Sequence, residues 1–192
     1  MVTVTDVDID VADREKVLNI FPAHIPAMML TPEGKERKHN SGVYFHQVPV
    51  NPVTGTCSVH YKQAEELGFF KIDILNFNLY QNINDEEHLY RLMNQEPIWE
   101  LLEHKDFCDM LIHLKGHHHV CKTMKPKTIE ELAMVLAIIR PAKKHLMWLS
   151  WQDIRKEIWT KPEDGDYYFK RSHGMAYAVA VVVHMNLICE TL

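Results

Sequence analysis

The sequence predicts an α+β fold, in which a small sheet is followed by a mainly helical region. Two stretches in the first part, residues 4–11 and 68–75, alternate apolar with polar residues, as strands with one buried face do. From Asn84 onward the apolar residues recur three and four positions apart, which is typical of helices. We therefore expect a sheet region over residues 1–80 and a helical region over residues 81–192.

The composition is that of an ordinary globular protein. The chain has 192 residues, of which 46% are hydrophobic and 24% charged, enough for one domain or two small ones. The acidic N-terminus does not resemble a signal peptide, and the longest apolar run, Met175 to Val183, is too short to span a bilayer. No C-x-x-C pair is present, which favours reduced thiols and a cytoplasmic location, and the short apolar run argues against a membrane partner.

The first alternating stretch carries three carboxylates. In the predicted strand Val4 to Val11, every second residue is acidic, namely Asp6, Asp8 and Asp10. Side chains two apart on a strand share a face, so the three carboxylates would point the same way. Their repulsion is costly unless a cation or a proton offsets it. The alternative interpretation is a solvated edge strand, whose charges prevent aggregation.

The second alternating stretch, Gly68 to Leu75, places Lys71 and Asp73 on one face of a strand and apolar residues on the other. If the two strands are neighbours, Asp6, Asp8 and Asp73 would form a cluster of hard oxygen ligands for divalent cations. Two-metal phosphoryl transfer requires such a cluster. The sequence therefore indicates a candidate catalytic and metal-binding site.

Other elements of the first region follow from local signals. Asp13 is a plausible cap for a helix that ends at Phe21, and three prolines between residues 22 and 32 exclude a long helix there. Residues 43–48 and 57–62 are predicted strands, joined by a loop rich in proline and glycine. A further strand over residues 69–75 completes a mixed or antiparallel sheet.

The helical region is predicted from caps and periodicity. Thr128 with Glu131, and Ser150 with Asp153, are capping-box pairs. The expected helices span residues 85–94, 97–115, 129–140, 151–159 and 174–189, with a loop over 161–166. Gly116 would end the second of them.

Three consecutive histidines, His117 to His119, together with Cys121 suggest zinc at first sight. Adjacent side chains cannot all reach one ion, and no second ligand pair has zinc spacing. The favoured interpretation is a polar turn after Gly116.

Charge is unevenly distributed along the chain. Residues 1–114 hold 9 Lys and Arg against 18 Asp and Glu, whereas residues 115–171 hold 12 against 7. This distribution suits a metal site with a phosphate-binding surface, or simply uneven solvated faces. The candidates for contact with a DNA backbone are Lys143, Lys144, Arg155 and Lys156, although solvated helix faces explain them almost as well.

Five segments, in order, resemble motifs of the bacterial C-family replicative DNA polymerases, the polymerase III α subunits. The first, residues 5–18, resembles P-D-x-D-x-D-F with the Arg and Val that follow, and residues 68–76 resemble G-L-V-K-x-D-x-L-G. Residues 38–45 resemble H-A-x-G-V-V-I. Residues 124–141 and 168–178 are similar to the family segments that end in R-P-G and contain N-K-S-H-A, respectively.

The resemblance implies a heavily shortened palm and fingers that perform DNA-templated nucleotidyl transfer. Asp6, Asp8 and Asp73 would be the catalytic ligands of Mg²⁺ or Mn²⁺, with Asp10 further out. The residues implied to bind the nucleotide are Lys71, Lys170, Arg171, Ser172 and His173. The implied partners are DNA, deoxynucleoside triphosphates and replication proteins.

The chain also departs from the family pattern. Only 28 residues separate Pro141 from Lys170, where the family has a long basic segment that grips the triphosphate. Thr5, Val11 and Ala142 replace the family's Pro, Phe and Gly. A non-catalytic relative that binds DNA or a replication partner is therefore the alternative, and Ser172 would then simply cap the last helix.

Overall fold

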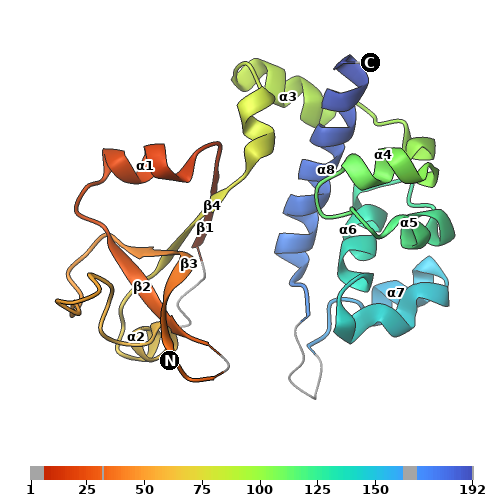
Figure 1. Ribbon diagram of the computed structural model, residues 1–192. Coiled ribbons are helices and arrows are strands. Elements are labelled where there is room, and N and C mark those ends of the chain that lie inside the picture. The colour runs from red at the N-terminus through yellow and green to blue at the C-terminus, as the bar shows by residue number, and fades with distance from the viewer. Residues whose placement is uncertain (1–6, 32, 162–167, 192) are drawn as a thin grey trace. The chain divides into compact units, whose positions relative to one another are not determined.

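The computed structural model describes residues 7–31, 33–161 and 168–191 (Figure 1). The chain forms two compact units, Met1–Ile83 and Asn84–Leu192. The first contains a small mixed sheet and the second consists of helices, so the expected α+β class is confirmed. Each unit is described by itself below.

The sheet of the first unit has four strands in the described part of the chain, in the order β1-β4-β3-β2. Their bounds are β1 Val7–Val11, β2 Ile25–Leu30, β3 Glu36–Tyr44 and β4 Ile72–Asn76. β1 runs parallel to β4, while β3 is antiparallel to both β4 and β2. β4 therefore lies inside the sheet, between the acidic strand β1 and β3.

Helix α1, Arg14–Ile20, begins at the expected cap. The Asp13 carboxylate accepts hydrogen bonds from the backbone N–H groups of Glu15, at 3.0 Å, and Lys16, at 3.1 Å. These bonds satisfy donors that the first turn of a helix leaves unpaired. Leu18 of α1 packs with Val43 and Ile74, and so covers the apolar face of the sheet.

The middle of the first unit differs from the prediction. β2 contains Pro26 and was not expected, since proline cannot donate to a ladder. It is tolerated because β2 is an edge strand whose register shifts between Pro26 and Met28. β3 begins at Glu36 and ends at Tyr44, not over residues 43–48.

Residues 57–62 do not form the predicted strand. Cys57 makes an isolated bridge to Val50, and helix α2, Tyr61–Glu66, follows it. The His60 ring starts α2, because its Nδ1 accepts the Lys62 N–H at 3.3 Å. A short 3₁₀ helix, η1, spans Asn78–Asn82.

The helical unit is built around α6 and α8, which pack against each other (Figure 1). Residues 132–138 of α6 are all buried, and they form one core with apolar residues of α8 and of the surrounding helices. The bounds are α3 Glu86–Asn94, η2 Trp99–Glu103, α4 Lys105–Met110, α5 His118–Met124, α6 Ile129–Ile138, η3 Pro141–Trp148, α7 Trp151–Glu157 and α8 Arg171–Thr191. The caps Thr128 and Ser150 are confirmed, since they accept the N–H groups of Glu131 and Asp153.

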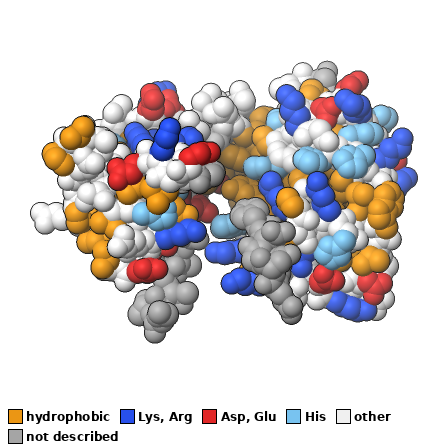
Figure 2. Space-filling view, turned by 60° about the horizontal axis from the view of Figure 1, so that its bottom comes forward, with side chains coloured by type: hydrophobic (Ala, Val, Ile, Leu, Met, Phe, Trp, Pro, Cys, Tyr) orange, Lys and Arg blue, Asp and Glu red, His pale blue; other side chains and the backbone are white. Residues whose placement is uncertain are grey.

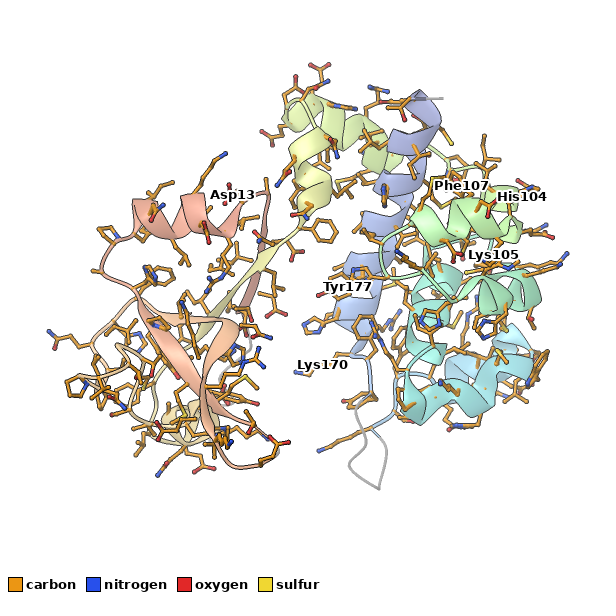
Figure 3. The ribbon with its side chains drawn as sticks, viewed as in Figure 1. Asp13, His104, Lys105, Phe107, Lys170 and Tyr177 are labelled. Atoms are coloured by element: carbon orange, nitrogen blue, oxygen red, sulfur yellow. The ribbon has the colours of Figure 1, made fainter. Side chains whose placement is uncertain are left out.

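One expected helix is interrupted. The prediction of a continuous helix over residues 97–115 is wrong, because His104 has extended backbone, with φ −96° and ψ 122°, between η2 and α4. Figure 3 shows His104 and Lys105 where α4 begins, with Phe107 on the same helix. The break lets both Leu102 and Phe107 enter the core, a requirement that periodicity does not reveal.

Helix α8 is longer than expected. It starts at Arg171, so Ser172 and His173 lie in its first turn and Ser172 is not its cap. By length and composition alone, α8 could cross a bilayer, although the apolar run Met175 to Val183 suggested otherwise. Its apolar side chains pack against α6, and buried Asn186 donates to the carbonyls of Leu92, at 2.9 Å, and Gln95, at 2.8 Å. These contacts make α8 a core element of its unit.

Candidate functional site

Asp8 and Asp73 occupy matching positions on adjacent strands. They are partners in the parallel pairing of β1 with β4. Neighbouring strands lie roughly 4.8 Å apart, and paired residues present their side chains on the same face. Asp10 lies two positions further along β1 and therefore shares this face. Asp6, the third expected ligand, lies outside the described residues.

The Asp73 carboxylate is held from two sides. The Ser41 hydroxyl donates to Oδ1 at 2.7 Å, and the Lys71 ammonium forms an ion pair with Oδ2. The His39 Nδ1 atom lies 3.6 Å from Oδ1. Only 6% of the Lys71 side chain and 13% of the Asp73 side chain are exposed, so this pair is largely shielded from water.

Gly42 makes room for the Lys71 side chain. Gly42 pairs with Asp73 across β3 and β4, and a Cβ atom there would lie 2.7 Å from the Lys71 Cδ atom. The lysine chain thus crosses its neighbouring strand where that strand has no side chain. The Lys71 Nζ atom lies 5.7 Å from the Tyr61 ring centroid, and the rings of Tyr61 and His39 meet edge to face at 5.2 Å. The cation is consequently fixed beside Asp73.

His39 is built in as a neutral imidazole. Its Nδ1 atom accepts the backbone N–H of Gly42 at 2.9 Å and that of Ser41 at 3.3 Å, which assigns the proton to Nε2. Burial lowers the pKa of His39, and the positive charges of Lys71 and Arg14 lower it further, while Asp73 opposes the shift. The ring orders residues 39–42 of β3, the part of the strand that presents Ser41 to Asp73.

Arg14 links this part of β3 to β4. Its guanidinium donates to the carbonyls of Ile74, at 3.1 Å, and Ser41, at 3.3 Å, and its backbone N–H donates to Asn76 at 2.7 Å. Arg14 and the β3 residues His39, Ser41 and Gly42 were not named as site residues from the sequence. The resemblance of residues 38–45 to a family motif was the signal that pointed to this part of the chain.

The expected nucleotide-binding residues other than Lys71 belong to the second unit. Lys170 precedes α8, while Arg171, Ser172 and His173 form its first turn (Figure 3). Beside them, the Phe169 and Tyr177 rings stack at 5.5 Å with an angle of 9° between their planes. The α8 N-terminus therefore carries cationic and aromatic side chains together.

One expected DNA-binding residue does not fit that role. Lys143 is 2% exposed, and its ammonium donates to the Glu157 carbonyl at 2.8 Å and to the Thr160 hydroxyl at 3.2 Å. The lysine thus closes the end of α7, where helix carbonyls lack partners.

The other three expected DNA contacts lie at the surface. Arg155 lies 3.4 Å from Glu130, and Lys156 lies 2.7 Å from Asp153, so both carry acidic neighbours. Lys144 is exposed. These side chains therefore do not form a uniformly basic face.

The histidine run lies in a helix, so the prediction of a polar turn is wrong. His117 precedes α5, while His118 and His119 form its first turn. The His118 Nε2 atom is 2.7 Å from the Glu103 carbonyl, which draws this ring towards η2. Packing of Val120 and Cys121 into the core accounts for the helix.

Comparison with known proteins adds no relative. No family model, no curated protein and no solved structure matches the chain. Among the described residues, no three His, Cys, Asp or Glu side chains converge as a preformed metal site. Because Asp6 lies outside these residues, the expected triad stays a prediction.

Proposed function

We propose that the chain is a minimal nucleotidyl transferase of the DNA polymerase III α type, with a reduced palm and fingers and a two-metal mechanism. The observation that supports it best is the pairing of Asp8 with Asp73 on adjacent parallel strands. Asp6, Asp8 and Asp73 would be the metal ligands. DNA and deoxynucleoside triphosphates would be the partners.

The donor set suits a hard divalent cation. Both described ligands offer carboxylate oxygens, which Mg²⁺ and Mn²⁺ prefer, and Mg²⁺ keeps several waters in addition to one or two carboxylates. When bound, the ions would activate a 3′-hydroxyl and stabilise negative charge on the leaving pyrophosphate. Ser41 fixes the orientation of Asp73, and so reduces the reorganisation that binding requires.

A metal ion at Asp73 would either displace the Lys71 ammonium or bind beside it. Its ammonium is paired with Asp73, so a metal ion and Lys71 compete for the same carboxylate oxygen. A lysine freed from Asp73 would lie beside the site as a cation for a phosphate group. The resemblance assigns further phosphate contacts to Lys170, Arg171, Ser172 and His173.

The alternative is a non-catalytic relative that binds DNA or a replication partner. The Lys71–Asp73 ion pair favours it, because an ammonium already neutralises one of the two paired carboxylates. Within this alternative, a duplex-binding face is the less supported form. Lys143 is buried, and Arg155 and Lys156 have acidic neighbours.

Primer extension with Mg²⁺ or Mn²⁺ tests the proposal. We expect slow incorporation that Asp8→Asn and Asp73→Asn each abolish. Asp13→Asn is the matched control, because asparagine also caps α1 and the Asp13 carboxylate accepts the N–H groups of Glu15 and Lys16. Calorimetry with Mn²⁺ should show loss of binding in the first two variants only. If Asp8→Asn and Asp73→Asn both bound the metal as the parent chain does, and no nucleotide were ever incorporated, the non-catalytic alternative would replace the proposed function.

A further inference from the structure

The helical unit contains a cavity of about 210 Å³ that the proposed chemistry does not use. It lies between the start of α5, the end of α6 and η3. Its wall includes the basic residues His117, His119 and Lys144 and the apolar residues Val120, Ile139 and Met147. Figure 2 shows several histidine side chains, with Lys or Arg side chains among them, on one face of this unit.

The basic residues of the cavity lack acidic partners. No Asp or Glu lines it. Within the described ranges, none of His117, His119 and Lys144 forms an ion pair, although Lys143 and His145 beside Lys144 both approach Glu157. Basic side chains therefore gather here without the carboxylates that pair with such side chains elsewhere in the unit.

The surroundings of His117 disfavour its protonated form. Burial lowers the pKa of His117, and the nearby charges of His119, Arg140 and Lys144 lower it further. An anion bound beside these side chains would stabilise the protonated form of His117 and offset the charge of Lys144.

We propose that this cavity binds a small phosphate monoester with a compact apolar body. The doubly charged phosphate would sit between His117, His119 and Lys144, and three acceptor oxygens match donors from three side chains. The apolar body would pack on Val120, Ile139 and Met147. The volume lies below the 300–1,000 Å³ typical of larger ligands, which limits the body to about one ring.

This site is independent of the proposed metal chemistry. All of its residues belong to the second unit, whereas Asp8, Asp73 and Lys71 belong to the first. Loss of one function should leave the other intact. Asp73→Asn is therefore expected to bind the probe as the parent chain does.

Calorimetry on the full chain with phenyl phosphate is the test. We expect phenyl phosphate to bind at least tenfold more tightly than inorganic phosphate or phenol, because only it combines charge with an apolar ring. Lys144→Gln and His119→Gln should each weaken binding at least fivefold. Lys122 is an exposed lysine of α5 that does not line the cavity. Lys122→Gln should therefore leave the affinity for phenyl phosphate unchanged.

Two results would overturn the proposal. One is equal affinity of the Lys144→Gln and Lys122→Gln variants for phenyl phosphate, with both variants folded by circular dichroism. The other is binding of inorganic phosphate as tightly as phenyl phosphate, which would show that the apolar wall contributes nothing.

Discussion

Gly42 and Lys71 form the closest fit in the candidate site: a Cβ atom on Gly42 would lie 2.7 Å from the Lys71 Cδ atom and 3.0 Å from the His39 Nδ1 atom. The lysine chain and the histidine ring thus occupy the space that a side chain on β3 would take. This fit explains how Lys71, the residue directly before β4, is buried and still reaches Asp73 two positions further along the chain.

Gly42→Ala should destabilise the first unit by about 1–3 kcal/mol, because an added methyl group in a filled space forces its neighbours to move. Denaturant unfolding measures this cost. In a Lys71→Ala background most of the cost should disappear, since the closest colliding atoms are gone. Additive effects of the two substitutions would show that Gly42 does not accommodate the lysine.

Lys71→Met should destabilise the first unit by about 3 kcal/mol, because it leaves a largely buried carboxylate without its cation. Thermal unfolding should show that millimolar Mn²⁺ restores part of this loss, since the ion can replace the ammonium at Asp73. Lys16→Met is the control. Its ion pair with Asp13 is exposed, and its removal should cost less than about 0.5 kcal/mol and respond little to Mn²⁺. Equal responses of both variants to the ion would contradict a metal site at Asp73.

Lys143→Met should cost the helical unit about 2–3 kcal/mol, because charged hydrogen bonds to the Glu157 carbonyl and the Thr160 hydroxyl are lost. The neighbouring Lys144→Met should change the free energy of unfolding by less than about 0.5 kcal/mol, as is usual for an exposed residue. Urea unfolding of both variants measures the difference. If the two variants proved equally stable, Lys143 would not have the structural role assigned to it.

Stability of the helical unit should fall as the pH drops below about 6.5. Burial lowers the pKa of His184, so the unfolded chain takes up its proton first and stability is lost between the ordinary pKa and the lower folded value. The pKa values of His113 and His117 are shifted in the same direction.

His184→Gln should flatten the pH dependence while keeping an acceptor for the Ile112 N–H, which the His184 Nδ1 atom accepts at 3.2 Å. His104→Gln is the control, since His104 is exposed. Unfolding free energies from pH 5 to 7.5 would show the difference. An unchanged slope in His184→Gln would mean that this histidine does not contribute.

The candidate site could be predicted only in part. Side chains alternate between the two faces of a strand, and this depends on one strand alone. The sequence therefore placed Asp8 and Asp10 on one face of a strand, and likewise Lys71 and Asp73. Sequence periodicity does not reveal which strands are neighbours, so the pairing of Asp8 with Asp73 required the topology. The contact of Ser41 with Asp73 spans 32 positions and depends on the same pairing.

The sequence by itself determined the α+β class and the starts of several helices. Asp13, Thr128 and Ser150 cap their helices through bonds to residues at most three positions away, so local chemistry suffices. Only the tertiary structure decided that Pro26 lies in a strand, that His104 interrupts a helical segment and that Lys143 is buried. Each of these depends on distant partners: an edge position in the sheet, a shared core, and the end of α7. Burial and long-range pairing outweigh local propensity because they contribute more free energy than the preference of any single residue.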